Sequence, residues 1–404
     1  MIKNIFRKKE KVEKKKLPIK LMIGVALITM IGIAAGSITT YFLMEKEIAL
    51  DNCLEEAKIP EINEAYQYII DDYYEEVDKD ELIDAAIKGM TSILDTHSSY
   101  MDPEETTLFN ELMTGSYRGV GIEFNKIDGQ HTVLGIIAKS PASKADLRVG
   151  DIIYKLDGVD YSDKTTTELS SYIKTNPKTD VLITIKRNNE EKEIKVTKAI
   201  VVLPSIESEV LKSGTKKIGY LKISVFADNT SDQFEEELLK VEKEKISGLI
   251  IDVRGNGGGY LHAANKMMEL FLQPGKIIYE MQTQKDVDLY KAFSNKKRSY
   301  PIVVLVNGAS ASASEIIAAA LKESYGAILV GTKTYGKGTV QQAKVMSNGG
   351  LIKITTNKWL TPSGFCVEGV GYNPDINVEL SEEYYKNPIP KNDNQLQRAL
   401  EELK

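Results

Sequence analysis

Histidine and cysteine are scarce in this chain of 404 residues, which contains three histidines and two cysteines. No spacing of histidine, cysteine and carboxylate residues resembles a zinc site, so the sequence predicts no metal centre. Cys53 and Cys366 are too few for a disulfide framework. They could form one bridge in an oxidising compartment, but we expect free thiols. Cys366 has no histidine in a matching motif, which argues against a cysteine nucleophile.

Charge is absent from residues 21–44, a run of 24 residues that is long enough to cross a bilayer. The first 44 residues contain nine Lys/Arg and two Asp/Glu, a net charge of +7, and because the whole chain carries −6, residues 45–404 carry −13. The basic segment 1–20 therefore predicts a cytoplasmic N-terminus, a single transmembrane anchor over 21–44 and an extracytoplasmic remainder at the cell membrane. The acidity of that remainder argues against a nucleic-acid partner.

A cleaved signal peptide is the alternative to this anchor. The stretch Ala34-Ala-Gly36 is an acceptable processing site. Apolar residues continue beyond it at Ile38, Tyr41, Phe42 and Leu43, which favours an uncleaved signal anchor.

The chain also contains a serine and a lysine, twenty-five residues apart, and each lies in a turn that follows a predicted buried strand. Ser312 follows the apolar run 302–306 and precedes a stretch of helix formers, so we expect its hydroxyl at a strand-to-helix turn, at the positive end of the helix. Lys337 stands between two glycines after the predicted strand 327–330. A lysine that burial has made neutral can act as the general base for a serine. The pair therefore indicates a serine–lysine dyad.

Two other interpretations of these runs are open. Ser312 and Glu315 fit a capping box, in which the serine only caps a helix. Residues 331–337 match seven of the eight positions of a phosphate-binding P-loop, but position 338 is glycine instead of the serine or threonine that binds the metal. The segment that follows, 339–356, has the composition of a β-hairpin, whereas a P-loop needs a helix there. We therefore favour the dyad over nucleotide binding.

A glycine-rich loop, Arg254-Gly-Asn-Gly-Gly-Gly259, lies between a predicted strand and a predicted helix. It could be no more than a tight turn, or it could form an oxyanion hole from its backbone N–H groups. His262 follows the loop and is the one histidine expected near the chemistry, so a Ser-His-Asp triad stays open as an alternative. His97 lies far upstream, and His131 lies in an apparent turn.

Periodicity divides the rest of the chain into segments. Residues 45–112 are predicted to be a helical N-terminal region, whose first amphipathic stretch, 54–74, could pair with a second copy as a homodimer or cover an intramolecular core. Residues 113–200 are rich in strands and suit a binding domain that accepts an added strand. Residues 201–380 alternate strands and helices, which indicates an α/β core, and 381–404 are predicted to be a charged C-terminal tail.

Taken together, these runs resemble the C-terminal processing peptidases, or tail-specific proteases, which use a serine–lysine dyad. The resemblance covers most of the chain, and its motifs occur in order. It implies an α/β multidomain protein with the helical N-terminal region, a β-rich PDZ domain at 113–200 and a crotonase- or ClpP-like serine protease core at 201–380. The motifs are Leu94-Asp-Thr-His-Ser-Ser-Tyr-Met-Asp102, Tyr117-Arg-Gly-Val-Gly-Ile122, Ser140-Pro-Ala-Ser-Lys-Ala-Asp-Leu-Arg-Val-Gly-Asp-Ile152, Asn307-Gly-Ala-Ser-Ala-Ser-Ala-Ser-Glu315, Thr334-Tyr-Gly-Lys-Gly-Thr-Val-Gln341 and Thr361-Pro-Ser-Gly364.

Carried over residue by residue, the resemblance implies Ser312 as the nucleophile, Lys337 as the general base and Gln341 as the residue that positions them. The oxyanion donors would be the backbone N–H groups of Ala313 and of a loop glycine, for which Gly258 is the first choice. The loop departs from the family's common Arg-Asn-Asn-Pro-Gly-Gly pattern, which leaves the choice of glycine open. The implied chemistry needs neither a metal nor an organic cofactor.

The PDZ resemblance implies that Gly119, Val120, Gly121 and Ile122 form the peptide-binding loop, although an ordinary strand start is the alternative. Substrates would be proteins or peptides with free, small or apolar C-termini. The sequence as a whole predicts a membrane-anchored, extracytoplasmic serine endopeptidase. The alternative is a catalytically silent PDZ scaffold at the membrane, whose signature would be loss of the serine, lysine or glutamine, and all three are present.

Overall fold

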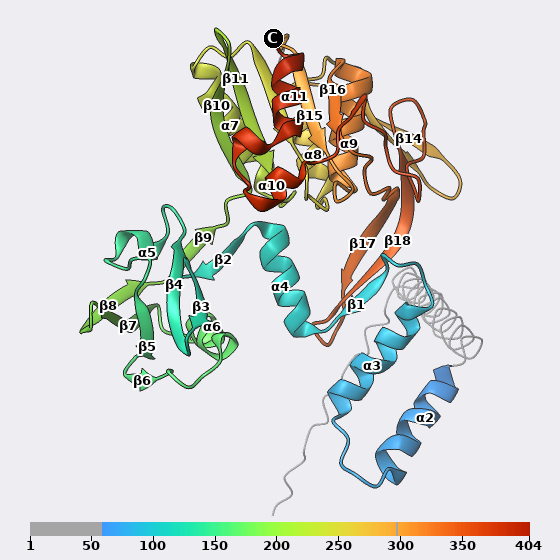
Figure 1. The fold of residues 1–404 in the computed structure, drawn as a ribbon. Helices are drawn as coiled ribbons and strands as arrows, with labels where there is room; N and C mark the ends of the chain where they lie inside the picture. Colours follow the sequence, from blue (N-terminus) through green and yellow to red (C-terminus); the bar gives the residue numbers. More distant parts are fainter. Residues whose placement is uncertain (1–58, 296–297) are drawn as a thin grey trace, which may run out of the picture. The chain divides into compact units, whose positions relative to one another are not determined.

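The computed structural model describes residues 59–295 and 298–404 (Figure 1). It divides into two units, residues 1–85 and 86–404, which are described separately. The predicted basic segment and transmembrane anchor, residues 1–44, lie outside the described residues. Within the described ranges, no helix has the length and apolar character needed to span a membrane.

Two helices open the described chain: α2 (Ile59–Asp72) and α3 (Lys79–Ser92). Helix α2 falls in the stretch 54–74, where the sequence predicts an amphipathic helix. No residue of α2 is buried, and α3 buries only Ile87 and Thr91. Most apolar residues of α2, among them Ile62 and Tyr68, are exposed in this structure.

The sequence predicts only helices for the end of the N-terminal region, but the structure contains a strand there. Strand β1 (Ser99–Met101) precedes helix α4 (Pro103–Thr114) and pairs antiparallel with β18 (Leu351–Leu360). Helix α4 begins with a capping box, in which Asp102 accepts the Glu105 N–H and the Glu105 side chain accepts the Asp102 N–H. The pairing of β1 is long-range, so local periodicity gave no sign of it.

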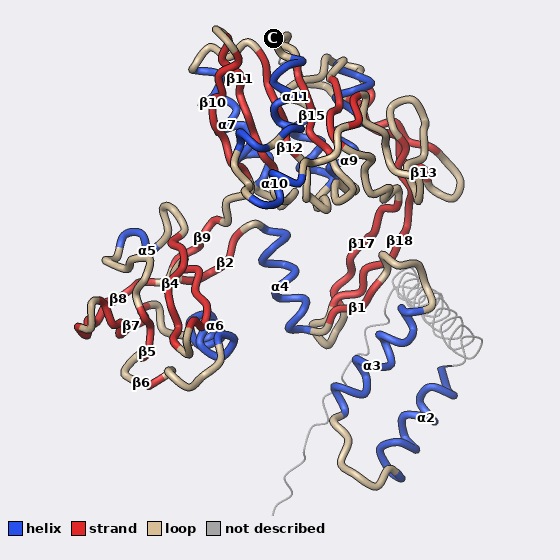
Figure 2. Tube along the Cα trace, in the orientation of Figure 1, coloured by secondary structure: helices blue, strands red, loops and turns tan. Residues whose placement is uncertain are grey.

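The β-rich module is an antiparallel sheet in the order β3-β4-β5-β7-β8 (Figure 2). Its strands are β3 (Ile122–Ile127), β4 (Gln130–Ile136), β5 (Ile152–Leu156), β7 (Asp180–Arg187) and β8 (Glu190–Thr197), and the short β6 (Val159–Asp160) pairs with β5. Helices α5 (Pro141–Lys144) and α6 (Thr166–Thr175) complete the module. Leu169 of α6 is fully buried with Val181 and Ile183 of β7, so the helix and the sheet share one apolar core.

The chain enters and leaves this module through paired strands. Strand β2 (Ser116–Gly119) runs antiparallel to β9 (Ala199–Val202). Val120 and Gly121 separate β2 from β3, because Gly121 has a φ of 82° and breaks the extended backbone.

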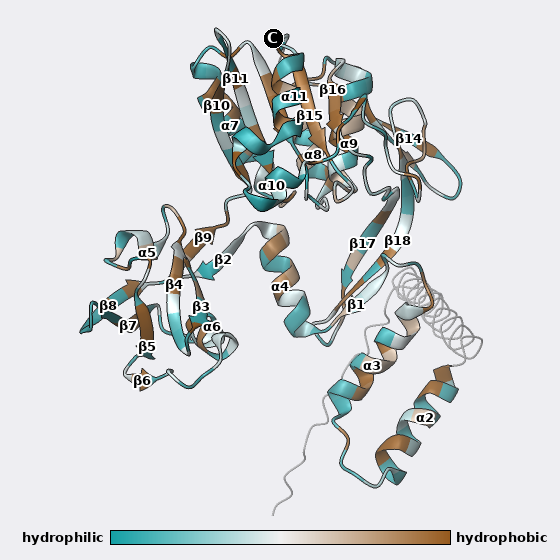
Figure 3. Ribbon diagram, viewed as in Figure 1, coloured by the Kyte–Doolittle hydropathy of each residue, from teal (hydrophilic) through white to brown (hydrophobic). Residues whose placement is uncertain are grey.

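The α/β core contains a sheet in the order β10-β11-β12-β15-β16-β19, in which only β10 and β11 are antiparallel. Every residue of β12 and β15 is buried, as expected for parallel strands that are covered on both faces, and Figure 3 shows hydrophobic residues along β15. The strands are β10 (Ile206–Ser213), β11 (Lys216–Ile223), β12 (Gly248–Asp252), β15 (Ile302–Val306), β16 (Ile328–Gly331) and β19 (Ile376–Asn377).

Helices cover both faces of this sheet. Alternate residues of β12 belong to different apolar clusters: Leu249 and Ile251 to one, and Ile250 to the other. The first cluster includes residues of α7 (Thr230–Lys243), α8 (Leu261–Met268), α9 (Ala313–Ala320) and the π-helical turn η1 (Leu321–Tyr325).

The second cluster contains the helix near the C-terminus, α11 (Asn394–Glu402), which follows α10 (Glu382–Lys386) and the short 3₁₀ turn η2 (Pro390–Asn392). Leu396, Ala399 and Leu403 are buried against strands β12 and β15. The sequence predicts a charged, partly helical C-terminal tail over 381–404, and helix α11 of this segment covers one face of the sheet. Because charged residues predominate in that segment, the sequence did not reveal the three apolar positions, spaced along one side of the helix, that cover the sheet.

A second sheet of the core has the order β1-β18-β13-β14, with β17 also paired to β18. Its other strands are β13 (Ile277–Gln282), β14 (Val287–Lys291) and β17 (Thr339–Val345). Strands β17 and β18 form the hairpin predicted from the sequence, with its turn at Ser347-Asn-Gly-Gly350.

Candidate active site

Three loops that follow neighbouring parallel strands form the candidate site. The glycine-rich loop follows β12, the serine turn follows β15 and the lysine loop follows β16, and these strands are adjacent in the sheet. The carboxyl ends of parallel strands meet at one edge, which is where open α/β sheets bind ligands. The order of the strands therefore brings together residues that are distant in the sequence.

The serine turn is strained and pinned to the sheet. Ser312 precedes α9 and has a φ of 55°, a value that costs energy in a residue with a side chain. The Ser310 hydroxyl donates to the Val253 carbonyl at 2.8 Å and accepts the Asn307 N–H at 2.9 Å. Because Val253 directly follows β12, these bonds fix the turn to the neighbouring strand and maintain the strained backbone.

A buried carboxylate connects the serine turn to the lysine loop. Glu315 is fully buried, and its Oε2 accepts the backbone N–H groups of both Ser312 (2.8 Å) and Lys337 (2.9 Å). Its Oε1 accepts the Gly336 N–H at 2.8 Å and the Thr334 hydroxyl at 2.5 Å. The capping-box interpretation is therefore incomplete, since the carboxylate bonds the Ser312 backbone and the lysine loop together.

Lys337 is half-buried in the loop between β16 and β17. The Trp359 indole N–H donates to the Lys337 carbonyl at 2.8 Å, and the Gly338 N–H donates to Glu368 Oε2 at 2.6 Å. The residues after the lysine enter strand β17 from Thr339 onward, so the P-loop interpretation, which needs a helix there, is wrong.

The surroundings of Lys337 favour its neutral form. Burial lowers the pKa of Lys337, and the positive charge of Lys353 lowers it further. The negative charges of Glu368, Asp95 and Glu315 oppose this change, but the net direction is downward. A lowered pKa is what a lysine needs in order to accept a proton near neutral pH.

The glycine-rich loop touches the serine turn at Gly258. This residue has a φ of 100°, and a Cβ there would lie 2.8 Å from the Ala311 carbonyl oxygen and 2.9 Å from Ser312 Cβ. The same Cβ would lie 3.1 Å from the Ala313 nitrogen. Only glycine permits this approach, so the structure brings Gly258 beside the two residues with which the sequence associates it.

The N–H of Gly258 is nevertheless used within the loop, because it donates to Asn256 Oδ1 at 2.8 Å. Gly257 and Gly259 line the neighbouring cavity. Gly258 could stabilise an oxyanion only after exchanging its bond to Asn256. The choice between glycines, which the sequence left open, therefore stays open.

Asn256 is a fully buried residue that the sequence analysis did not single out. Its carbonyl accepts the Ala311 N–H at 3.1 Å and the Ser314 hydroxyl at 2.9 Å. Its side-chain amide donates to the Ile223 carbonyl at 2.9 Å. Asn256 thus connects the glycine loop to the serine turn and to β11. The only sign of this role in the sequence is that Asn256 is a polar residue within a run of glycines.

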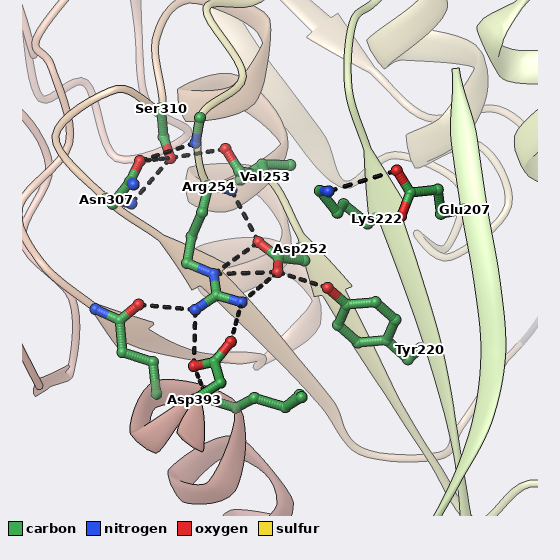
Figure 4. Close-up of polar contacts among 12 residues, drawn as sticks. Glu207, Tyr220, Lys222, Asp252, Val253, Arg254, Asn307, Ser310 and Asp393 are labelled. Atoms are coloured by element: carbon green, nitrogen blue, oxygen red, sulfur yellow. Dashed lines mark hydrogen bonds and ion pairs between the residues drawn. The ribbon is translucent and has the colours of Figure 1, made fainter. Parts of the chain in front are cut away.

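Arg254, at the start of the glycine loop, lies between two carboxylates (Figure 4). Its guanidinium approaches Asp252 to 2.6 Å and Asp393 to 2.8 Å, and only 11% of the side chain is exposed. It also donates to Gln395 Oε1 at 2.9 Å, and the Tyr220 hydroxyl donates to Asp252 at 2.8 Å. Asp393 and Gln395 belong to the C-terminal segment, which therefore holds the glycine loop directly.

A cavity of about 400 Å³ lies at the meeting point of these loops. Ser312, Lys337 and Gln341 all line it, so the structure brings the three predicted catalytic residues together. No acidic side chain of the described residues lines this cavity. Its apolar wall is formed by Phe109, Met113, Tyr260, Leu261, Val340 and Leu351.

The contacts of Gln341 are with threonines. Its amide nitrogen donates to Thr339 Oγ1 at 3.0 Å and to Thr355 Oγ1 at 3.1 Å, and Thr355 donates to Asp95 Oδ1 at 3.0 Å. Burial would raise the pKa of Asp95, but hydrogen bonds, including those from Ser98 and Thr355, lower it to about 2. An ionised carboxylate thus anchors the chain of bonds that ends at Gln341.

His262 lines the same cavity, and its Nε2 lies 2.7 Å from Asp228 Oδ1. This pair keeps the triad alternative open. The turn predicted at His131 is wrong, because the chain turns at Asp128 and Gly129 and His131 is a buried residue of β4. Its Nε2 lies 3.0 Å from the Lys164 carbonyl oxygen, within the β-rich module.

The four predicted peptide-binding residues are contiguous at the start of β3. Gly119 ends β2, Val120 and Gly121 form the connection, and Ile122 begins β3. Val120 and Ile122 line a cavity of about 270 Å³. A Cβ at Gly121 would lie 2.2 Å from Ser140 Cβ, so this connection requires glycine.

Helix α4 lines both this region and the catalytic cavity. A groove of about 980 Å³ includes residues of β3, α6 and α4, and Glu111 of α4 pairs with Lys174 of α6 at 2.5 Å. Phe109 and Met113 of the same helix line the catalytic cavity.

Similarity to characterised sequences identifies the family. The chain is 33% identical over 376 residues to the "Probable CtpA-like serine protease" of Staphylococcus aureus (strain MSSA476), which covers 92% of this chain and 74% of that protein. The chain belongs to the CtpA-like serine proteases. It is also 34% identical over 378 residues to the Staphylococcus epidermidis protein of the same name, which covers 93% of this chain and 75% of that one.

Family models agree with this assignment. Residues 217–378 match peptidase family S41, 119–197 match a PDZ domain, and 36–106 match the N-terminal domain of the activating protease CtpB. The solved structure of a photosystem II D1 C-terminal processing protease is 24% identical, with a TM-score of 0.47, over 83% of this chain and 89% of that one. The predicted resemblance, the α/β multidomain fold class and the assignment as a serine endopeptidase are confirmed. This S41 peptidase therefore acts on protein or peptide substrates.

We expect Glu315→Gln to lower kcat strongly. The carboxamide keeps the shape of the side chain but replaces one acceptor oxygen by a donor, so N–H groups of the serine turn or the lysine loop lose their partner. Each lost bond costs about 1–3 kcal/mol of the free energy of unfolding, and the two catalytic segments separate. Steady-state kinetics and chemical denaturation test both effects.

Glu323→Gln is the matched control, because Glu323 also accepts a backbone N–H, from Ser363, and a hydroxyl, from Tyr372, but lies outside the cavity. We expect a similar loss of stability with kcat preserved. If Glu315→Gln lowered the free energy of unfolding but left kcat unchanged, as we expect for Glu323→Gln, the carboxylate would not determine the active-site geometry.

Proposed function

We propose that this S41 peptidase is a membrane-anchored, extracytoplasmic serine endopeptidase that cleaves through a Ser312–Lys337 dyad and selects substrates by their C-termini. One observation carries the catalytic part: both side chains line one cavity while Glu315 bonds both backbones. The lowered pKa of Lys337, caused first by burial, adds to this support.

In the proposed reaction, the neutral amine of Lys337 accepts the proton of the Ser312 hydroxyl, and Oγ attacks the scissile carbonyl carbon. Backbone N–H groups of Ala313 and of a loop glycine, Gly258 or a neighbour, stabilise the oxyanion. The intermediate collapses as Lys337 gives its proton to the leaving amine. A water molecule that loses a proton to Lys337 then attacks the acyl-enzyme, and the proton returns to Ser312 Oγ when the acid product leaves.

Gln341 has a positioning role in this proposal. Its amide is held by Thr355, and Thr355 is held by the ionised Asp95, so the side chain has a fixed position on the cavity wall. A catalytically silent PDZ scaffold is disfavoured, because family membership assigns peptidase activity and Ser312, Lys337 and Gln341 are all retained.

The PDZ domain is proposed to read the substrate C-terminus. Support comes from the cavity lined by Val120 and Ile122, on either side of the connection at Gly121, which suits a small apolar side chain. A peptide added along β3 would place its final residue there.

The membrane anchor is proposed from the sequence of residues 1–44, in which a basic segment precedes 24 uncharged residues. A homodimer through the exposed apolar residues of α2 remains an arrangement that the sequence permits.

Replacing either dyad residue should abolish turnover without unfolding the protein. We expect Ser312→Ala and Lys337→Ala to reduce kcat/KM on an unfolded protein substrate to background, with unchanged thermal unfolding. Because the neutral amine is the active form, wild-type activity should rise with pH through one ionisation of Lys337. His262→Ala is the control, and if it matched Ser312→Ala, a triad would replace the dyad.

The intact chain should fractionate with membranes, and residues after Glu45 should be accessible to protease added from the outside of cells. The physical reason is the uncharged segment 21–44 behind its basic flank. Recovery of a soluble form that begins near Ser37 would instead identify a cleaved signal peptide.

Cleavage should depend on the substrate C-terminus. We expect one substrate to be cut faster with a free apolar C-terminus than with an amidated end or a final Asp-Asp. Ser170→Trp, which fills the groove from α6, should remove this preference, whereas Asp163→Trp on the exposed preceding turn should not. Equal rates for all three substrates, unaffected by Ser170→Trp, would rule out the PDZ domain as the reader.

A further inference from the structure

The catalytic cavity contains a second lysine, Lys353, to which the proposed reaction assigns no step. Lys353 lies near the start of β18, where it pairs with Ala343 of β17 and with Ser99 of β1. The side chain is half-buried, and Nζ lies 6.0 Å from the centre of the Phe109 ring. Strands on both sides thus fix the backbone of Lys353, and an aromatic face provides a weak site for its cation.

Lys353 has no close counter-ion. Among the residues that the structure describes, no carboxylate oxygen lies within ion-pair distance of its Nζ, and the cavity has no acidic lining residue. Burial lowers the pKa of Lys353, and the negative charge of Asp95 opposes this by favouring the charged form. A half-buried ammonium that is not neutralised by a partner projects its charge into the cavity.

The carboxylates near the two lysines are occupied by other donors. Glu315 accepts four hydrogen bonds from backbone and hydroxyl groups, and Glu368 accepts the Gly338 N–H. Asp95 accepts hydrogen bonds from the Ser98 and Thr355 hydroxyls. These anions therefore offset part of the positive charge at a distance without forming a contact ion pair with either lysine.

We propose that Lys353 is a positioning residue whose positive charge, in the cavity it shares with Lys337, keeps Lys337 in the neutral form that accepts the serine proton. Two ammonium groups in one partly desolvated cavity repel each other, so the pair tends to hold a single proton. Asp95 favours the charged form of both lysines, but the positive charge of Lys353 acts against the charged form of Lys337, so Lys337 is left as the free amine. This inference rests on the proposed Ser312–Lys337 dyad.

Removal of the charge tests the proposal. In Lys353→Met and Lys353→Gln, the pH profile of kcat/KM on a fluorogenic peptide should move to higher pH, because Lys337 then retains its proton more tightly. At pH 7 we expect kcat/KM to fall about 3- to 10-fold and to recover to the wild-type value at alkaline pH. Lys353→Arg, which preserves the charge, should keep the wild-type profile. Lys358→Met, on the exposed part of the same strand, is the matched control.

The other titratable side chains on the cavity wall are His262 and Tyr260. The series is therefore repeated with His262→Asn, so that the histidine cannot produce the shift. Thermal unfolding identifies any variant that fails to fold, and the two neutral replacements are independent of each other.

Three results would overturn the proposal. An equal fall at every pH, in the arginine variant as well, would mean that Lys353 only packs the cavity. A rise in KM without a displaced profile would mean that it binds substrate, and unchanged kinetics would remove any role. The dyad fails separately if Lys337→Ala remains active, whereas an inactive Lys337→Ala with an undisplaced Lys353→Met profile refutes this inference alone.

Discussion

The geometry of the candidate site depends on one buried carboxylate. A single oxygen of Glu315 accepts the backbone N–H groups of both Ser312 and Lys337, so the carboxylate holds the two segments close together. A charge this deeply buried is tolerated only when donors saturate it, and Glu315 has four. The donors and the carboxylate therefore define each other's positions. The strained backbone of Ser312 persists because this network and the bonds of Ser310 leave the turn no relaxed alternative.

Most other polar residues of the site connect its loops to one another. Few of them would touch a substrate. Asn256 fastens the glycine loop to the serine turn, Arg254 fastens it to the C-terminal segment, and Asp95 holds Gln341 through Thr355. The cavity itself has apolar walls and two lysines. Such a wall accommodates extended peptide, while the desolvation it causes is the first reason for the lowered pKa of Lys337.

Local sequence patterns predicted the features that depend on residues close together in the chain. The β17–β18 hairpin and the position of Ser312 at the start of a helix follow from such patterns. The approach of a loop glycine to Ser312 was implied by the family resemblance. Pairings between distant segments have no periodic signature, so the partners of Asp95 and Arg254 could not be found. His131 was misplaced because the turn at Asp128 and Gly129 ends two residues before His131, and β4 already begins at Gln130. The direction of the Gly258 N–H depends on the orientation of a single peptide plane, which no residue pattern encodes.

The salt bridge between Arg254 and Asp393 also has a consequence for the order of assembly. Strands β12, β15 and β16 and all three loops of the candidate site precede residue 393 in the chain, so the ribosome makes them before this partner exists. Until Asp393 has emerged, the guanidinium has only Asp252 as its anion, and the face of the sheet that α11 covers is bare. The glycine loop can therefore reach its final anchoring only late in synthesis. A nascent chain that already contains its serine and its lysine is still an unfinished protease.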